Sequence, residues 1–286
     1  MDTFKATTDY ALLLFGLPNL QPMTVLAFFF LTLARMLPII SLAPFLGSKT
    51  IPATIRMMFG IAFVAIFLPQ NLLAAHGEIP YGMAFIGLMI KELLIGSVIG
   101  FLAAIPFYTA QMAGGLVDHQ RGASALQVTD PSTQTQTGSI GLLYNYVLIA
   151  IFFSLNGPFL FLDGLANAYQ LIPVDGFLSP TLFSIDTPFI KLLFGLFKYV
   201  MNLSIQLSAP ALIGILLTDA FLGIANRLAP QVQIVFLGIS LKSWVGIALL
   251  TASWSLVIKV MGQESINWFK SLNVIMQQVG MFYMSK

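Results

Sequence analysis

Six long apolar stretches limit how this chain can fold. They lie at about residues 25–46, 51–68, 83–107, 140–172, 189–217 and 232–261. Each approaches or exceeds the roughly 20 residues that a helix needs to cross about 30 Å of hydrocarbon. Open strands would leave backbone groups unpaired in lipid, and the sequence lacks the ten-residue alternating segments of a membrane β-barrel. The stretches therefore predict an all-α integral membrane protein.

The composition supports this class and excludes several functions. Of the 286 residues 58% are hydrophobic and only 8% are charged, whereas a soluble domain carries about 25% charged residues. The absence of cysteine excludes disulfides, thiolate metal sites and a cysteine nucleophile. A net charge of +2 without any run of Lys or Arg does not favour nucleic acid as a partner.

Turn-forming residues suggest how the stretches are divided. Asn156-Gly157-Pro158 interrupts the fourth stretch, so the six stretches can form seven or eight helices, some broken or paired as hairpins. We expect a single membrane domain over residues 1–286. It would contain an N-terminal segment at 1–24, a polar loop at 117–138 and an amphipathic tail at 262–286. The basic turn at 47–56 favours the cytoplasmic side for that turn.

Charged residues inside apolar stretches are the most informative single positions. They are Arg35, Lys91, Glu92, Lys198 and Lys242. A charge near the bilayer centre costs about 2.5–3.5 kcal/mol, so five facing lipid would cost on the order of 12–18 kcal/mol. We therefore expect them to face other helices or other subunits.

Pairing among these residues is constrained by helix geometry. Adjacent helical residues point about 100° apart, so we expect Lys91 and Glu92 to find partners on other elements rather than each other. Basic residues outnumber acidic ones in the apolar stretches, which leaves water, lipid phosphate or acidic partners to satisfy the excess. Arg56, Lys191 and Lys259 can instead extend to the headgroups.

No catalytic, cofactor or metal site is predicted. The two histidines, His76 and His119, are 43 positions apart, and no phosphate loop, zincin helix or dinucleotide fingerprint occurs. His119 and Ser124 share one loop, which does not fit an intramembrane serine protease with its base on a separate helix. Gly96 and Gly100 form a G-x-x-x-G pair that favours close helix packing.

Several strings occur together in one order along the chain. They are Ala43–Gly47, Ile51–Ala53 with Arg56, Lys91–Gly96, Gly114–Gly122, Asn156-Gly157 and Leu222–Gln231. In this combination the chain resembles the T/R family of type III secretion export-apparatus proteins, which comprises flagellar FliR and virulence SctT (YscT, SpaR). The string LGIANRLAPQ is the most specific, and Ser208-Ala209-Pro210 with Asp219 favours the virulence branch.

The resemblance implies a structural subunit of an export gate in the bacterial inner membrane. It would form, with SctR/FliP-like and SctS/FliQ-like subunits, the pore for unfolded exported proteins, beside SctU/FlhB-like and SctV/FlhA-like proteins. The polar loop matches the family's plug, which implicates Asp118, His119, Gln120, Arg121, Gly122, Gln127, Asp130 and Pro131. Contacts between helices or subunits are expected from Arg35, Lys91, Glu92, Gly96, Gly100, Asn226, Arg227, Pro230 and Gln231.

One alternative of another class stays open at the level of sequence. In a secondary transporter, Lys91, Glu92 and Lys198 would bind a solute or couple protons near the midplane of the membrane. A transporter should move a solute when reconstituted alone. A gate subunit should instead copurify with other export proteins.

Overall fold

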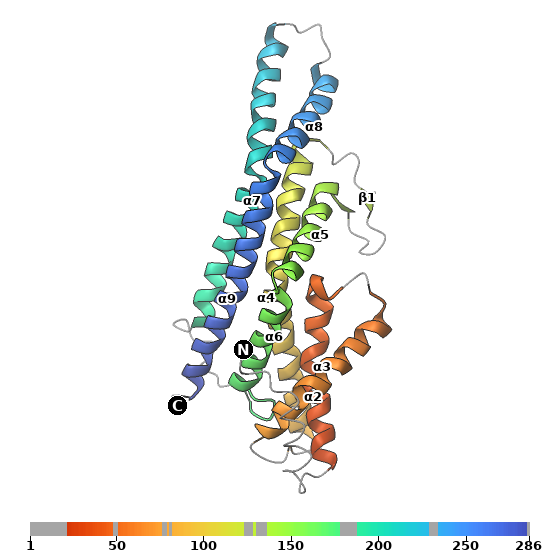
Figure 1. The fold of residues 1–286 in the computed structure, drawn as a ribbon, viewed down its shortest axis with the longest axis vertical. Coiled ribbons are helices and arrows are strands. Elements are labelled where there is room, and N and C mark those ends of the chain that lie inside the picture. The colour runs from red at the N-terminus through yellow and green to blue at the C-terminus, as the bar shows by residue number, and fades with distance from the viewer. Residues whose placement is uncertain are drawn as a thin grey trace. The chain divides into compact units, whose positions relative to one another are not determined.

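The computed structural model describes residues 22–47, 51–75, 79, 82–122, 128–129, 136–177, 188–228 and 234–284. Its helices and strands follow the chain as shown in Figure 1. In order they are α2 (Pro22–Leu42), the 3-10 helix η1 (Pro44–Leu46), α3 (Ala53–Leu73), α4 (Met83–Gln120), β1 (Val128–Thr129), β2 (Gln136–Thr137), α5 (Ser139–Ser154), α6 (Gly157–Leu171), α7 (Pro188–Leu228), α8 (Ile234–Ala252) and α9 (Trp254–Met284).

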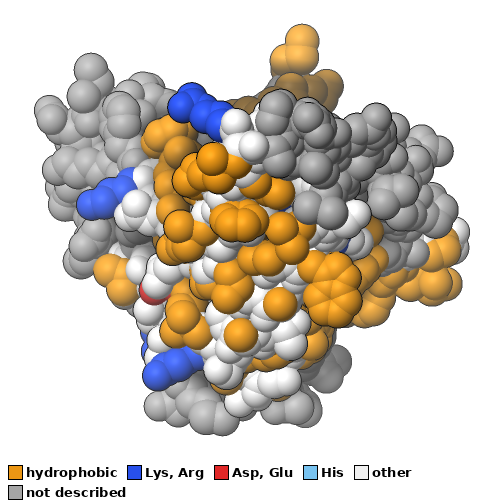
Figure 2. Space-filling model, turned by 90° about the horizontal axis from the view of Figure 1, so that it is seen from above, with side chains coloured by type: hydrophobic (Ala, Val, Ile, Leu, Met, Phe, Trp, Pro, Cys, Tyr) orange, Lys and Arg blue, Asp and Glu red, His pale blue; other side chains and the backbone are white. Residues whose placement is uncertain are grey.

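This architecture confirms an all-α membrane protein. Four described helices are long and apolar enough to cross a bilayer, and two bent helix pairs raise the number of candidate spans to six. Eight α-helices occur in the described ranges, which agrees with the upper end of the predicted count. Figure 2 shows a face covered mainly by hydrophobic side chains, with isolated Lys and Arg residues among them.

The breaks between helices have local causes. Asn156 separates α5 from α6 with a positive φ of 57°, a conformation that asparagine tolerates better than most residues. Between α8 and α9 the axis bends by 63° at Ser253, whose hydroxyl donates to the Leu249 carbonyl at 2.8 Å. Such back-bonding by serine bends helices. The first break was predicted from the sequence and the second was not.

The predicted loop and tail also differ from the observed elements. Helix α4 continues to Gln120, so residues 117–120 are helical and the loop begins after them. The tail continues α9 without interruption to Met284. Pro106 and Pro210 lie inside α4 and α7, which remain unbroken helices around them.

The described contacts divide the chain into two compact units. The first comprises Met1–Ala104, Gly157–Phe194 and Phe269–Lys286, and the second Ile105–Asn156 and Gly195–Trp268. In the first unit, the ring centroids of Phe45 and Phe161 lie 5.1 Å apart. In the second, the ring centroids of Phe107 and Phe152 lie 5.4 Å apart. Each unit thus has its own aromatic contacts, while the expected single domain stays a prediction.

Two glycines allow α2 and α4 to approach closely within the first unit. A methyl group added at Gly96 would collide with the backbone of Arg35, and one at Gly100 would lie 2.9 Å from the Ile39 Cα. Both are contacts with backbone atoms, which cannot rotate away. The G-x-x-x-G pair therefore lies directly against α2.

We predict that Gly96→Ala lowers the free energy of unfolding by about 1–3 kcal/mol, the usual cost of forcing extra atoms into a packed contact. Thermal unfolding of the purified chain in detergent measures the effect. Gly115→Ala on the same helix is the matched control, because nothing lies within 4 Å of its added Cβ. Equal stability of Gly96→Ala and the wild type would contradict the tight contact.

Candidate functional site: a buried charge cluster and an anchored loop

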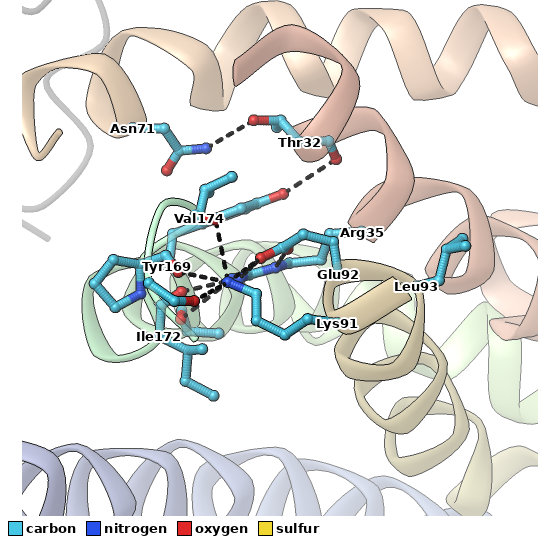
Figure 3. A network of polar contacts seen from close by, with 12 residues as sticks. Thr32, Arg35, Asn71, Lys91, Glu92, Leu93, Tyr169, Ile172 and Val174 are labelled. Atoms are coloured by element: carbon cyan, nitrogen blue, oxygen red, sulfur yellow. Dashed lines mark hydrogen bonds and ion pairs between the residues drawn. The ribbon is translucent and has the colours of Figure 1, made fainter. Parts of the chain in front are cut away.

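Three charged side chains meet inside the first unit and form what we call the charge cluster: Arg35 of α2 with Lys91 and Glu92 of α4. The side chains of Arg35 and Glu92 are fully buried and that of Lys91 is 5% exposed. Figure 3 shows all three pointing toward the end of α6, while the neighbouring Leu93 lies apart from them. The cluster therefore removes three charges from contact with lipid.

Glu92 accepts bonds from both cations. Arg35 donates from Nη2 to Oε1 at 2.8 Å and from Nε to Oε2, the two-pronged arrangement that suits guanidinium and carboxylate. The Lys91 Nζ lies 2.7 Å from Oε1. The expectation that Lys91 and Glu92 do not pair is therefore wrong. The flexible four-carbon stem of lysine lets its ammonium swing to a neighbour that a rigid side chain would miss.

Main-chain carbonyls complete the coordination of the two cations. Arg35 donates to the carbonyls of Ala168 at 3.4 Å and Ile172 at 2.9 Å. Lys91 donates to three further carbonyls, those of Pro173 at 2.9 Å, Val174 at 3.1 Å and Gly176 at 2.7 Å. These carbonyls form the last turn of α6 and the segment directly after it.

The cluster thus caps a helix end within an apolar stretch. The last four carbonyls of a helix have no partner within the helix, and the helix dipole makes that end negative. The two cations donate hydrogen bonds to these carbonyls. The carboxylate balances one positive charge, and the negative end of the helix stabilises the other. Arg35 also lies 4.3 Å from the centre of the Tyr169 ring, a cation–π contact.

A second layer of polar contacts surrounds the cluster. The Tyr169 hydroxyl donates to the Thr32 carbonyl at 3.5 Å, and the Asn71 amide donates to the Thr32 hydroxyl at 3.1 Å. Arg35, Lys91 and Glu92 were predicted from the sequence, whereas Thr32, Asn71, Tyr169 and the carbonyls were not. Asn71 inside an apolar helix was the one available signal for this layer.

The second unit holds the base of the polar loop, which we call the loop clasp: Asp118 and Arg121 of α4 with Ser139 and Ile140 of α5. Asp118 is 4% exposed, and its Oδ2 accepts from the Ile140 amide at 2.9 Å and the Gly141 amide at 3.3 Å. A carboxylate so placed satisfies free amides at a helix N-terminus and complements its dipole.

Arg121 and nearby glycines tighten the clasp. Arg121 donates to Asp118 Oδ1 from Nε at 2.9 Å and from Nη2 at 2.5 Å, and Nη2 also reaches the Ser139 hydroxyl at 2.8 Å. A Cβ at Gly138 would collide with the Asp118 carboxylate, and one at Gly114 would lie 2.6 Å from the Gly141 Cα. Between the ends, Val128 pairs with Thr137 and Thr129 with Gln136 in an antiparallel hairpin.

The other predicted site residues do not join the charge cluster or the loop clasp. His119 and Gln120 are exposed on the last turn of α4, and Gly122 follows with a φ of 81°. Asn226 and Arg227 are exposed in the last turn of α7. Lys242 of α8 pairs with Asp219 of α7, an acidic partner that was not predicted for it. Gln127, Asp130, Pro131, Pro230 and Gln231 lie outside the described residues.

These features define a multi-pass membrane protein whose buried charges hold helix ends in place. Residues 26–267 match the family described as bacterial export proteins, family 1. The chain belongs to this family, which confirms the T/R family of the type III export apparatus that its motifs predicted.

Curated relatives from both branches of the family are similar to the chain. It is 34% identical over 161 residues to Yop proteins translocation protein T of Yersinia pestis, covering 56% of this chain and 60% of the relative. It is 36% identical over 152 residues to secretion system apparatus protein SsaT of Salmonella typhimurium, covering 53% and 57%. It is 31% identical over 170 residues to flagellar biosynthetic protein FliR of Bacillus subtilis, covering 59% and 64%. The matched segment thus spans less than two thirds of each relative.

We predict that Glu92→Gln destabilises the chain by about 3–5 kcal/mol, because it leaves two buried cations without their carboxylate. The double variant Arg35→Met with Glu92→Met should lose less, since neither charge of that pair is left alone. Thermal unfolding in detergent compares the three proteins. Glu264→Gln, which removes a carboxylate outside the cluster, is the control. A double variant no more stable than Glu92→Gln would contradict the pairing.

We predict that Asp118→Ala weakens the start of α5 by about 0.5–2 kcal/mol, the usual cost of removing an N-terminal cap. Hydrogen exchange of the Ile140 and Gly141 amides should accelerate, and proteases should cut the loop faster. His119→Ala, which changes an exposed neighbour, controls for the substitution itself. Unchanged exchange at both amides would show that Asp118 does not hold the helix end.

Proposed function

We propose that this chain is a structural subunit of the type III export gate in the bacterial inner membrane. It forms, with R-type and S-type subunits, the pore through which unfolded proteins leave the cytoplasm, and its polar loop partly closes that pore. Family membership supports the export role, because related proteins are named for translocation, secretion and flagellar biosynthesis.

The loop clasp is the observation that carries the gate proposal. A plug for a pore needs a polar segment that can move while both of its ends stay fixed in an apolar scaffold. Asp118 ties the end of α4 to the start of α5 through two amides, and Arg121 adds a contact to Ser139. The loop between these ends is rich in Gln, Thr and Ser. The buried Asp118 carboxylate and the half-buried Arg121 guanidinium at its base are difficult to separate where the local dielectric is low.

The charge cluster gives the first unit rigidity. Glu92 is fully buried and both of its oxygens are occupied by Arg35, while Lys91 binds three carbonyls. Coupling protons or binding a solute requires a charged group that can exchange partners with water. Lys91 and Glu92 are thus committed to internal contacts and do not join the exposed Lys198 in one site, which favours a structural subunit over a secondary transporter.

We predict that deleting residues 123–136 makes the assembled gate permeable to ions, because the plug is lost while the clasp residues remain. Dye or ion release from liposomes containing the complex measures the leak. A variant that replaces the same residues with a Gly/Ser sequence of equal length separates the loop's length from its chemistry.

Assembly must be checked in the same preparation. The deletion variant should still copurify with the R-type and S-type subunits, since the helices that would meet them are intact. A wild-type chain that fails to copurify with these subunits would overturn the export-gate role. An assembled deletion variant as tight as the wild type would overturn the plug role alone.

A further inference from the structure

A polar pocket opens on the second unit between α7 and α9. Its volume is about 310 Å³, and it is lined by Gly195, Lys198, Tyr199, Asn202, Leu203, Gln206 and Glu264. This volume falls at the lower end of the range of about 300–1,000 Å³ that small-ligand sites occupy. A pocket with two opposite charges and two amides is unusual in a chain of which only 8% is charged.

The pocket offers unused donors and acceptors. Lys198, Asn202 and Gln206 are exposed and recur every four residues, so they share one face of α7. Among the described residues, neither the Lys198 ammonium nor the Glu264 carboxylate has an ion-pair partner. Pro210 has no N–H, so the Gln206 carbonyl also lacks its usual donor within the helix.

Aromatic side chains form one wall beside the pocket. The rings of Tyr199 and Trp268 stack with their centres 4.5 Å apart, and the Tyr199 hydroxyl donates to the Glu264 carbonyl at 3.2 Å. The Tyr199 hydroxyl thus holds the Glu264 backbone beside the pocket.

The rest of α7 indicates the depth of the pocket in the membrane. Between Gln206 and Asn226 its exposed large side chains are apolar: Ile213, Leu216, Leu217, Phe221 and Ile224. Asn226 and Arg227 are exposed in its last turn. From Gln206 to Asn226 the helix rises about 30 Å at 1.5 Å per residue, which equals the hydrocarbon thickness of about 30 Å. The polar face with Lys198, Asn202 and Gln206, which is about 12 Å long, then falls toward the headgroup layer, with an apolar track for acyl chains beside it.

From this arrangement we infer that the pocket binds the headgroup of a zwitterionic phospholipid with a primary ammonium, as in phosphatidylethanolamine. Lys198 and the two amides bind the phosphate, and the Glu264 carboxylate accepts from the ammonium. A purely anionic headgroup would be repelled by Glu264, and a purely cationic group by Lys198. Only a ligand with both a negative and a positive charge matches Lys198 and Glu264 together.

The inference does not rest on the export role, since its test uses the isolated chain. Native mass spectrometry of the full chain in detergent, titrated separately with dioleoyl phosphatidylethanolamine, phosphatidylcholine and phosphatidylglycerol, reads the number of bound lipids. Phosphatidylethanolamine should be retained about tenfold more tightly than phosphatidylcholine, whose trimethylammonium cannot donate a hydrogen bond; one charge-assisted bond accounts for such a ratio.

Two variants and one control make the test decisive. Glu264→Gln should bring the affinities for phosphatidylethanolamine and phosphatidylcholine to within about twofold, and Lys198→Gln should weaken the retention of all three lipids. Gln263→Ala, an exposed neighbour that does not line the pocket, should behave as the wild type. Equal retention of the three lipids by the wild type would overturn the inference. So would Glu264→Gln and Lys198→Gln variants that keep the lipid preference of the wild type, because the pocket would then not hold the headgroup.

Discussion

The described structure depends on charged side chains that cap helix ends inside an apolar environment. A helix that ends within a membrane leaves carbonyls unpaired, and each buried polar group without a partner costs several kcal/mol in hydrocarbon. Arg35 and Lys91 supply donors to the end of α6 and Glu92 balances their charge. A buried cation and an unpaired buried carbonyl each raise the free energy of the folded state. When the cation donates hydrogen bonds to the carbonyl, both groups are satisfied.

The start of the bent helix pair α5–α6 is capped by a side chain of the opposite charge. Asp118 places a carboxylate on the first amides of α5, whereas α6 ends against two cations. Negative charge at a helix N-terminus and positive charge at a C-terminus both complement the helix dipole. The helices from Ser139 to Leu171 are thus fixed at both outer ends by ionised side chains from α2 and α4. That arrangement explains why charges appear in such apolar helices.

Sequence reasoning located the elements better than their ends and contacts. The break at Asn156 was predictable, because Asn-Gly-Pro disfavours a continuing helix, whereas the bend at Ser253 rests on one serine hydroxyl with no breaker nearby. Pro106 and Pro210 lie inside α4 and α7, where each removes a single helix bond without ending the helix. Arg35, Lys91 and Glu92 were identifiable from their cost in lipid. Their carbonyl partners were not, because every residue carries a carbonyl and only the tertiary path brings particular ones close.

The five charges inside apolar stretches separate into two groups once their partners are known. Arg35, Lys91 and Glu92 satisfy one another with the end of α6, and Lys242 pairs with Asp219. Lys198 differs, because it is exposed beside a polar pocket and has no ion pair in the described part of the chain. A charge that the fold does not satisfy must meet water, lipid or another protein. The position of Lys198 at the end of a long apolar track therefore identifies the part of this surface where an external polar group is required.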